Sequence, residues 1–306
     1  MVASGLVLID KPTDWTSHDV VAKVRKAVGT KKVGHAGTLD PLATGLLVLG
    51  IDATGLLVLG IESGTKLLTF LVGAEKTYLA TIRLGVSTVS DDSQSEVLET
   101  ASQEALAAVE VAQIQQEILK LTGVIQQRPS SVSAIKVDGK RAYDLVRSGQ
   151  EVELKSREVT VGSFELVSSS RSPEGFIDLE VKVDCSSGTY IRALARDLGQ
   201  ALGVGGHITS LRRTRVGSFD VAKANQITDL ENLALTPLAQ AASDLFPIIN
   251  LSAEQVTDLI HGKRLSDVGE QSGLIAGLSG SGDLVAVLEP VGSGLKSVVV
   301  FQGEQK

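Results

Sequence analysis

The stretch GHAGTLDP, residues 34–41, organises the rest of the chain. Its two glycines permit backbone turns that other residues resist. Pro41 disfavours a helical conformation for Asp40, so this carboxylate is predicted to project from an extended backbone just before the apolar run 46–49. Such a position suits a catalytic acid, although for this stretch alone a polar turn with local hydrogen bonds is the better explanation.

The longer stretch GHAGTLDPLATG, residues 34–45, resembles the catalytic motif of the TruB family of bacterial tRNA pseudouridine-55 synthases. Further blocks resemble the family's other motifs and occur in the same order along the chain. They are LIDKP (8–12) with TSHDV (16–20), KTY (76–78), SAIK (133–136) with GKRAY (139–143), CSSGTYIR (185–192) with DLG (197–199), and HITSLRRT (207–214). The resemblance is strong from about Gly5 to Phe219 and weaker beyond.

The resemblance implies an enzyme that isomerises uridine 55 in the T-loop of tRNA to pseudouridine. Asp40 would be the catalytic carboxylate, Arg192 the arginine that pairs with it, and Tyr78 the tyrosine that stacks on the flipped-out uracil. RNA contacts are expected from His35, Lys11, Arg212 and Arg213. Taken without the resemblance, Arg192 reads as a surface helix arginine and Tyr78 as a core tyrosine on an alternating strand.

Pseudouridine formation breaks the N1–C1′ bond, turns the base and rejoins it through C5. Nothing is oxidised or hydrolysed, so no cofactor is expected. No metal is expected either, because the four histidines are scattered and the single cysteine, Cys185, has no partner at ligand spacing. The sequence leaves open whether Asp40 attacks C1′ or removes the C2′ proton.

Two other functions compete with this interpretation. One is a non-catalytic RNA-binding or tRNA-folding module that keeps Asp40 without turnover. The other is a nucleoside-cleaving hydrolase, which is disfavoured because no second acidic residue stands at a recognisable paired position.

Helices mixed irregularly with alternating strands predict an α+β fold, with a largely antiparallel, mixed sheet and flanking helices. Residues 177–185 alternate apolar and charged side chains and give the cleanest strand signal. Ser17 is predicted to cap a helix that runs to about Val28 and stops at Gly29. We expect a catalytic domain in residues 1–244 and, by resemblance, a small β-rich RNA-binding module of the PUA type in residues 245–306.

The net charge of −7 argues mildly against a nucleic-acid partner, but the distribution of charge is more informative than the sum. Basic residues gather at 23–32 and 212–223, whereas acidic residues gather at 91–117 and read as a solvated face. No apolar stretch is long enough to span a membrane, and the N-terminus lacks the features of a signal peptide. We therefore expect a cytoplasmic monomer that binds the T-arm of tRNA and no membrane.

The nonapeptide ATGLLVLGI occurs twice, at 43–51 and again at 53–61. The family pattern has one such segment, so the two copies compete for one strand position. We predict that the first copy forms the strand, which keeps Asp40 close to it, and that residues 51–60 form an added excursion. Asp52, which precedes the second copy, lacks the glycine-rich approach and the following proline, and is interpreted as a decoy.

Overall fold

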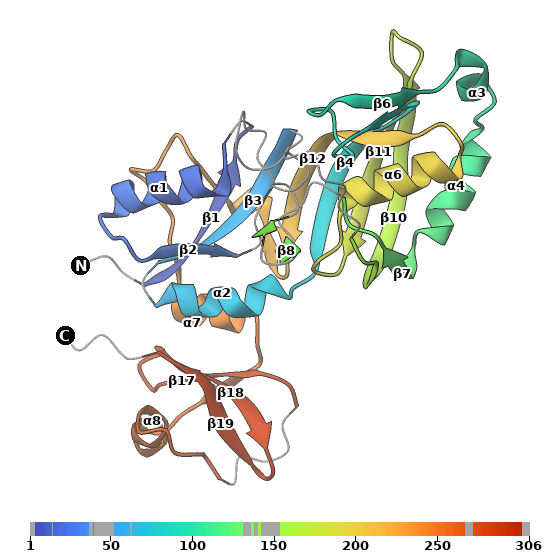
Figure 1. Ribbon diagram of the computed structural model, residues 1–306. Helices are drawn as coiled ribbons and strands as arrows, with labels where there is room; N and C mark the ends of the chain where they lie inside the picture. The colour runs from blue at the N-terminus through green and yellow to red at the C-terminus, as the bar shows by residue number, and fades with distance from the viewer. Residues whose placement is uncertain are drawn as a thin grey trace.

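A computed structural model of the protein describes residues 4–13, 15–36, 39, 52–61, 63–130, 136–137, 140–141, 154–266 and 272–301 (Figure 1). Within these residues one long sheet has the order β14-β1-β3-β12-β4-β11-β10-β7, with β2, β13 and β15 paired at its side. Its strands are β1 (Gly5–Lys11), β2 (Val33–Ala36), β3 (Asp52–Ile61), β4 (Lys76–Leu84), β7 (Gly123–Gln127), β10 (Arg157–Arg171), β11 (Ile177–Cys185), β12 (Gly206–Val216), β13 (Phe219–Asp220), β14 (Asn225–Gln226) and β15 (Thr236–Pro237).

Antiparallel pairing dominates this sheet. β4 lies between β11 and β12 and is antiparallel to both, whereas β12 pairs with β3 in parallel. Helices α1 (Ser17–Val28), α2 (Gly64–Val72), α3 (Gln103–Ala107), α4 (Val111–Lys120), α6 (Ile191–Ala201) and α7 (Leu238–Ser243) accompany it, with the short helix η1 (Val221–Lys223). The predicted α+β class with a mixed, largely antiparallel sheet is therefore confirmed.

The alternation in residues 177–185 explains why β11 forms in the centre of the sheet. Leu179, Val181 and Val183 are buried in a cluster that also contains Leu194 and Leu198 of α6. Burial of such a side chain stabilises the fold by about 1.5–3 kcal/mol. This packing holds α6 against the sheet and so places the beginning of the helix beside β4.

The cap of α1 differs from the prediction. Thr16, not Ser17, is the N-cap: its hydroxyl accepts from the backbone N–H of Asp19, and the Asp19 carboxylate accepts from the backbone N–H of Thr16. Ser17 fits the cap preference equally well, but its hydroxyl is used elsewhere. Gly29 ends the helix in the left-handed conformation, as predicted.

The second copy of the duplicated segment forms β3, so the prediction that the first copy fills this strand is wrong. β3 pairs with β1 from Ile61↔Gly5 to Gly55↔Lys11. α2 begins at Gly64, where a Cβ atom would lie 2.1 Å from the Gly5 carbonyl oxygen. The second copy leads directly into α2, and the two copies have identical sequences, so their strand propensity does not distinguish them. The first copy, residues 43–51, lies outside the described residues.

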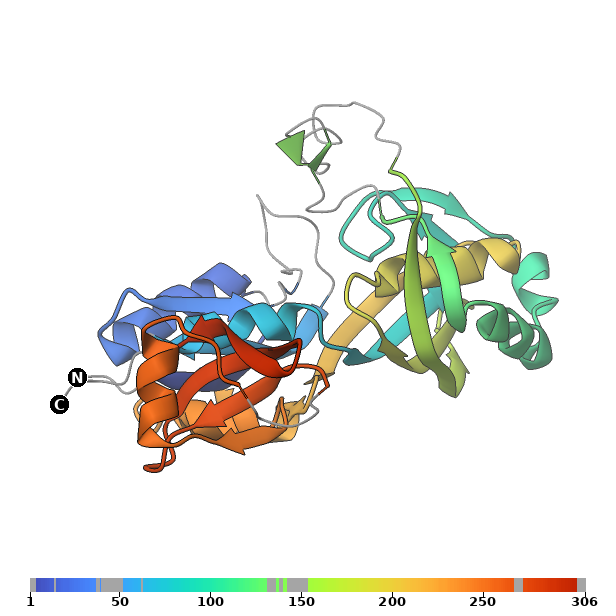
Figure 2. The same ribbon diagram turned by 90° about the horizontal axis from the view of Figure 1, so that it is seen from below.

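A second sheet, with the order β16-β17-β18-β19, forms the C-terminal part of the described chain. It consists of β16 (Ile248–Asn250), β17 (Ile275–Leu278), β18 (Leu284–Val291) and β19 (Gly294–Val300), and α8 (Ala253–Ile260) packs on it. Figures 1 and 2 show this sheet next to α2 and α7. Leu67 and Leu71 of α2 share one buried cluster with Val287 and Phe301.

Two small hairpins complete the description: β5 (Val86–Thr88) pairs with β6 (Val97–Thr100), and β8 (Lys136–Val137) pairs with β9 (Lys140–Arg141). No helix within the described ranges is long and apolar enough to cross a membrane.

Candidate active site

Asp40 lies outside the described residues, but its neighbour Leu39 does not. The Leu39 backbone N–H donates to Ser17 Oγ at 3.1 Å, and Ser17 Oγ in turn donates to the Leu39 carbonyl at 3.3 Å. Both residues are buried, at 3% exposure each. The residue before Asp40 is thus tied to the first turn of α1.

A pocket of about 310 Å³ lies where β4, β12 and the beginning of α6 meet. Leu39 forms part of its wall, which places the approach to Asp40 at the pocket. The described lining consists of Leu39, Val72, Lys76, Tyr78, Arg157, Ser187, Gly188, Thr189, Tyr190, Ile191, Arg192, Leu211 and Arg213.

Tyr78 and Arg192, two of the residues predicted from the sequence, come together at this pocket. Tyr78 stands on β4, opposite Val183 of β11 and Arg213 of β12, and is 9% exposed. Arg192 is the second residue of α6 and is 2% exposed. Their spacing in the sequence gives no sign of this proximity; the antiparallel pairing and the packing of α6 create it.

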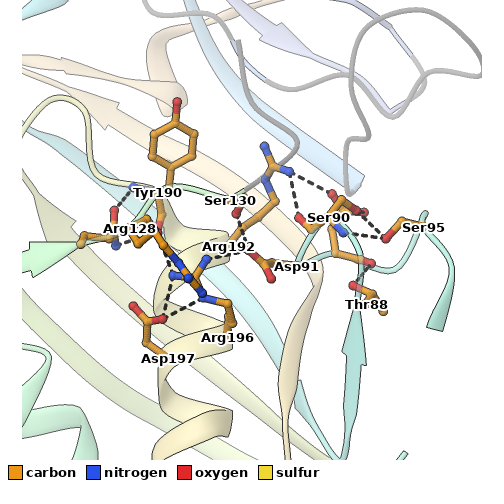
Figure 3. A network of polar contacts seen from close by, with 12 residues as sticks. Thr88, Ser90, Asp91, Ser95, Arg128, Ser130, Tyr190, Arg192, Arg196 and Asp197 are labelled. Carbon is orange, nitrogen blue, oxygen red and sulfur yellow. Dashed lines mark hydrogen bonds and ion pairs between the residues drawn. The ribbon is translucent and has the colours of Figure 1, made fainter. Parts of the chain in front are cut away.

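The guanidinium of Arg192 is held from behind by the loop that follows β5 (Figure 3). Arg192 Nη1 donates to the Ser90 carbonyl at 3.0 Å and to Asp92 Oδ2 at 3.3 Å. Asp92 is fully buried. A buried pair of this kind contributes little net stability, because desolvation opposes the attraction, but it fixes the position of both groups. The family resemblance assigns Arg192 to Asp40, and that pairing stays a prediction.

Asp91, which immediately precedes Asp92, binds Arg196, one helical turn after Arg192 in α6. Its carboxylate accepts from Arg196 Nη1 at 3.1 Å and from Ser130 Oγ at 2.6 Å. Arg196 Nη2 also donates to the Arg128 carbonyl at 2.7 Å. Burial raises the pKa of Asp91, and the adjacent Arg196 opposes that rise. The network joins α6, the loop after β5 and the segment after β7, as Figure 3 shows.

The sequence analysis did not predict a role for Asp91 and Asp92 at the site, because it placed both in an acidic, solvated segment. Their arginine partners stand about a hundred residues later, and no local pattern links them. The positive φ of Asp91, 61°, is a backbone signal of a constrained site, but only the structure shows it.

Lys76 is a third residue to which the resemblance assigned no role. It is 6% exposed, and its ammonium donates to the carbonyls of Ala74 (2.6 Å) and Val72 (3.1 Å). Burial and, to a smaller extent, the nearby positive charge of Arg213 together lower the pKa of Lys76 to about 8.

Of the residues predicted to contact RNA, Arg213 lies in the pocket wall and is 1% exposed. His35 stands on β2; burial, then Arg213 and His18, lower its pKa, so its neutral form is favoured. Its Nδ1 is buried with no hydrogen-bond partner in the described part of the chain.

Lys11 and Arg212 occupy other positions. Lys11 is fully buried, and its ammonium donates to the carbonyls of Pro12 (2.9 Å) and Trp15 (2.7 Å). Arg212 forms a two-pronged ion pair with Asp10, at 2.8 and 3.0 Å. Neither belongs to the described pocket lining. Contact of these four residues with RNA stays a prediction.

The described pocket wall joins aromatic rings to four cationic side chains and contains no carboxylate, which suits a polyanion that carries a planar group. Among the residues that the structure describes, no three His, Cys, Asp or Glu side chains gather in a way that could hold a metal ion.

Comparison with known proteins gives matches to three family models. The family model described as TruB family pseudouridylate synthase (N terminal domain) matches residues 25–53 and 51–191. A tRNA pseudouridylate synthase B C-terminal domain model matches residues 192–250, and a tRNA pseudouridine synthase II C-terminal model matches residues 246–302. The first match breaks inside the duplicated segment, as expected if one copy is additional to the family pattern.

Full-length relatives give the same result. The tRNA pseudouridine synthase B of Leifsonia xyli subsp. xyli is 54% identical, covering 100% of this chain and 99% of that protein. The protein of the same name from Paenarthrobacter aurescens is 49% identical, with 97% and 95% covered. A solved chain titled as an H/ACA RNP bound to a substrate RNA containing 2′-deoxyuridine has a TM-score of 0.70 at 23% identity, with 98% and 86% covered, and shows the shared fold.

The chain therefore belongs to the TruB family. It is a pseudouridine synthase, an isomerase, and its C-terminal sheet corresponds to the PUA-like part of the family.

Proposed function

We propose that this synthase isomerises the uridine at position 55, in the T-loop of tRNA, to pseudouridine and that it needs no cofactor. The observation that supports this most directly is the pocket itself. It unites Leu39, which precedes Asp40, with Tyr78 of β4 and Arg192 of α6, three segments that are distant in the sequence. The printed names of the relatives supply the substrate class.

The proposed reaction needs three functions from the protein. Asp40 supplies an ionised carboxylate that either attacks C1′ or removes the C2′ proton, and the positive charge of Arg192 favours that ionised form. Tyr78 offers its ring to the uracil that has left the base stack. The N1–C1′ bond breaks, the C5–C1′ bond forms, C5 loses a proton and N1 gains one, so atoms and electrons balance without any co-reactant.

The remaining residues are proposed to hold the RNA. His35 would lie against the opened T-loop, and Lys11, Arg212 and Arg213 would contact the substrate around the pocket. We further propose residues 1–244 as the catalytic unit and residues 245–306 as a PUA-like RNA-binding unit. The protein is inferred to act as a monomer on the T-arm, in the cytoplasm where tRNA is processed.

The proposed function is tested by incubating the protein with an unmodified tRNA transcript and mapping pseudouridine by position. We expect modification at position 55. Release of free uracil would identify a hydrolase instead. Tight tRNA binding with no product over many hours would identify a non-catalytic RNA-binding module.

Tyr78→Leu is expected to reduce the single-turnover rate far more than the affinity for tRNA. Its ring contributes one base stack, worth about 1–3 kcal/mol, whereas phosphate contacts dominate affinity. Tyr78→Phe is the matched control: it keeps the ring and should keep the affinity, so its rate reports on the hydroxyl alone. An equal loss of rate and affinity in Tyr78→Leu would make Tyr78 a general binding residue.

A further inference from the structure

The described wall of the pocket has an imbalance of charge. It contains four cations, Lys76, Arg157, Arg192 and Arg213, and no Asp or Glu within the described residues. Arg192 is compensated by Asp92, which lies behind it. Asp40 is assigned to Arg192 and uracil is neutral, so neither of them offsets the positive charges of Arg157 and Lys76.

Arg157 is fixed at the rim by the loop that leads into α6. It is the first residue of β10, and its guanidinium lies 4.8 Å from the centre of the Tyr190 ring. Its Nη2 donates to the carbonyl of Gly188. Gly188 has a φ of 88°, and a Cβ atom there would lie 3.7 Å from the guanidinium. The backbone of this turn thus packs against the Arg157 guanidinium and holds it in place.

A chain of hydrogen bonds in the pocket wall continues from this turn to Lys76. Ser187 Oγ donates to the Val72 carbonyl at 2.6 Å, and the Lys76 ammonium donates to the same carbonyl at 3.1 Å. Arg157 and Lys76 are therefore joined through Gly188, Ser187 and Val72 along one side of the pocket.

Both cations keep donors that the described contacts do not use. An ammonium has three N–H groups, and the described contacts of Lys76 take two, to Val72 and Ala74. The one described side-chain hydrogen bond of Arg157 leaves from Nη2, so the described contacts leave Nη1 unused, whereas Nε is buried. A planar guanidinium with free N–H groups matches the geometry of a phosphate.

We infer that Arg157 and Lys76 form a seat for the phosphodiester that flanks the target uridine. The inference rests on the proposed function. It adds a substrate-positioning role for Arg157 and Lys76, which have no role in the reaction described above. The phosphate is the anion that RNA brings to such a rim. By holding the backbone next to the flipped nucleotide, the seat fixes the distance between the ribose and the carboxylate that acts on it.

The test combines a protein variant with a change in the RNA. Single-turnover rates are measured with a T-arm stem-loop RNA in which the phosphate 5′ or 3′ to the target is replaced by a neutral methylphosphonate. Arg157→Gln should lower the rate about 10- to 100-fold, the equivalent of one charge-assisted hydrogen bond. One of the two neutral linkages should lower the wild-type rate by a similar factor. In Arg157→Gln that same linkage should have no further effect, because both changes remove one contact.

Two variants control for folding and for general charge. Arg171→Gln removes the same charge from the far end of β10 and should leave the rate and the effect of the neutral linkage unchanged. Arg157→Lys keeps the charge without the planar fork and should recover part of the loss. Thermal melting shows whether each variant is folded, and the methylphosphonate arm on the wild-type protein needs no variant at all.

The outcomes separate this inference from the function on which it rests. The phosphate seat would be overturned if each neutral linkage lowered the rate of Arg157→Gln by the same factor as that of the wild type. It would also be overturned if neither linkage affected the wild-type rate. In both cases pseudouridine formation would still stand. Absence of pseudouridine from the unmodified stem-loop and from whole tRNA would overturn both.

Discussion

Asp40→Asn is expected to abolish pseudouridine formation while tRNA affinity stays equal to that of the wild type or becomes slightly tighter. The amide cannot attack C1′ or remove the C2′ proton, and loss of a group in either role costs at least about 10²- to 10⁴-fold in rate. Affinity depends mainly on phosphate contacts, which the substitution leaves in place. Rate is measured by single-turnover product mapping, and affinity by filter binding.

Asp52→Asn is the matched control for this experiment. Asp52 precedes the second copy of the repeat as the first residue of β3, where its backbone pairs with Ser210 of β12. Because it lacks the glycine-rich approach and the proline of Asp40, its substitution should leave the rate within about twofold of the wild type. A normal rate in Asp40→Asn would refute the assignment of Asp40, and a loss confined to Asp52→Asn would assign the carboxylate to Asp52 instead.

Deletion of residues 51–60 is expected to raise both the rate and the melting temperature. The shortened chain still has one ATGLLVLGI segment, and the remaining copy can take the place of β3 with an identical sequence. β3 now begins twelve positions after Asp40, and in the shortened chain this separation becomes two. The strand and the Ser17–Leu39 hydrogen bonds hold the two ends of the connection, so the deletion shortens the segment that carries Asp40, the proposed catalytic carboxylate.

The expected size follows from two effects. An error of about 1 Å in the position of a catalytic group can cost on the order of 100-fold in rate, so the deletion variant should be about 10-fold faster or more. Closing a shorter connection restores about 1 kcal/mol of loop entropy, which raises the melting temperature by about 2 °C for a chain of this size. Single-turnover kinetics measures the change in rate, and calorimetry measures the change in melting temperature.

A pair of polar variants controls for the choice of copy. Leu46→Ser with Val48→Ser changes the first copy, and Leu56→Ser with Val58→Ser makes the same change in the second, whose Val58 pairs with Leu8 of β1. The second pair should lower the melting temperature more than the first. A deletion variant that melts lower or reacts more slowly than the full chain would mean that the additional copy is an integrated part of the fold.

Local patterns in the sequence were sufficient for the framework of the fold. The alternation in residues 177–185 predicts β11, because a half-buried strand needs exactly that period of two, and Gly29 predicts the end of α1 because its left-handed turn favours glycine. The motif resemblance led to Tyr78 and Arg192, which the pocket brings together.

Features that depend on long-range contacts could not be predicted in this way. Asp92 meets Arg192 across a separation of 100 positions, which no local pattern reveals. Lys76 looks like an ordinary charged residue of a strand until the packing of the sheet buries it. The choice between Thr16 and Ser17 as the cap depends on Leu39, whose backbone engages the Ser17 hydroxyl. The two repeat copies are identical in sequence, so local strand propensity could not show which of them pairs with β1.

The shared cluster between α2 and the C-terminal sheet has a consequence for the order in which the protein folds. During synthesis α2 leaves the ribosome directly after the repeat, but its apolar face is completed by Ala276, Leu284, Val287 and Phe301, which are made much later. The nascent chain therefore carries an incompletely covered helix next to an apolar repeat, the kind of surface that chaperones bind. Expression at low temperature or with added chaperone should increase the yield of this chain more than that of the chain lacking residues 51–60.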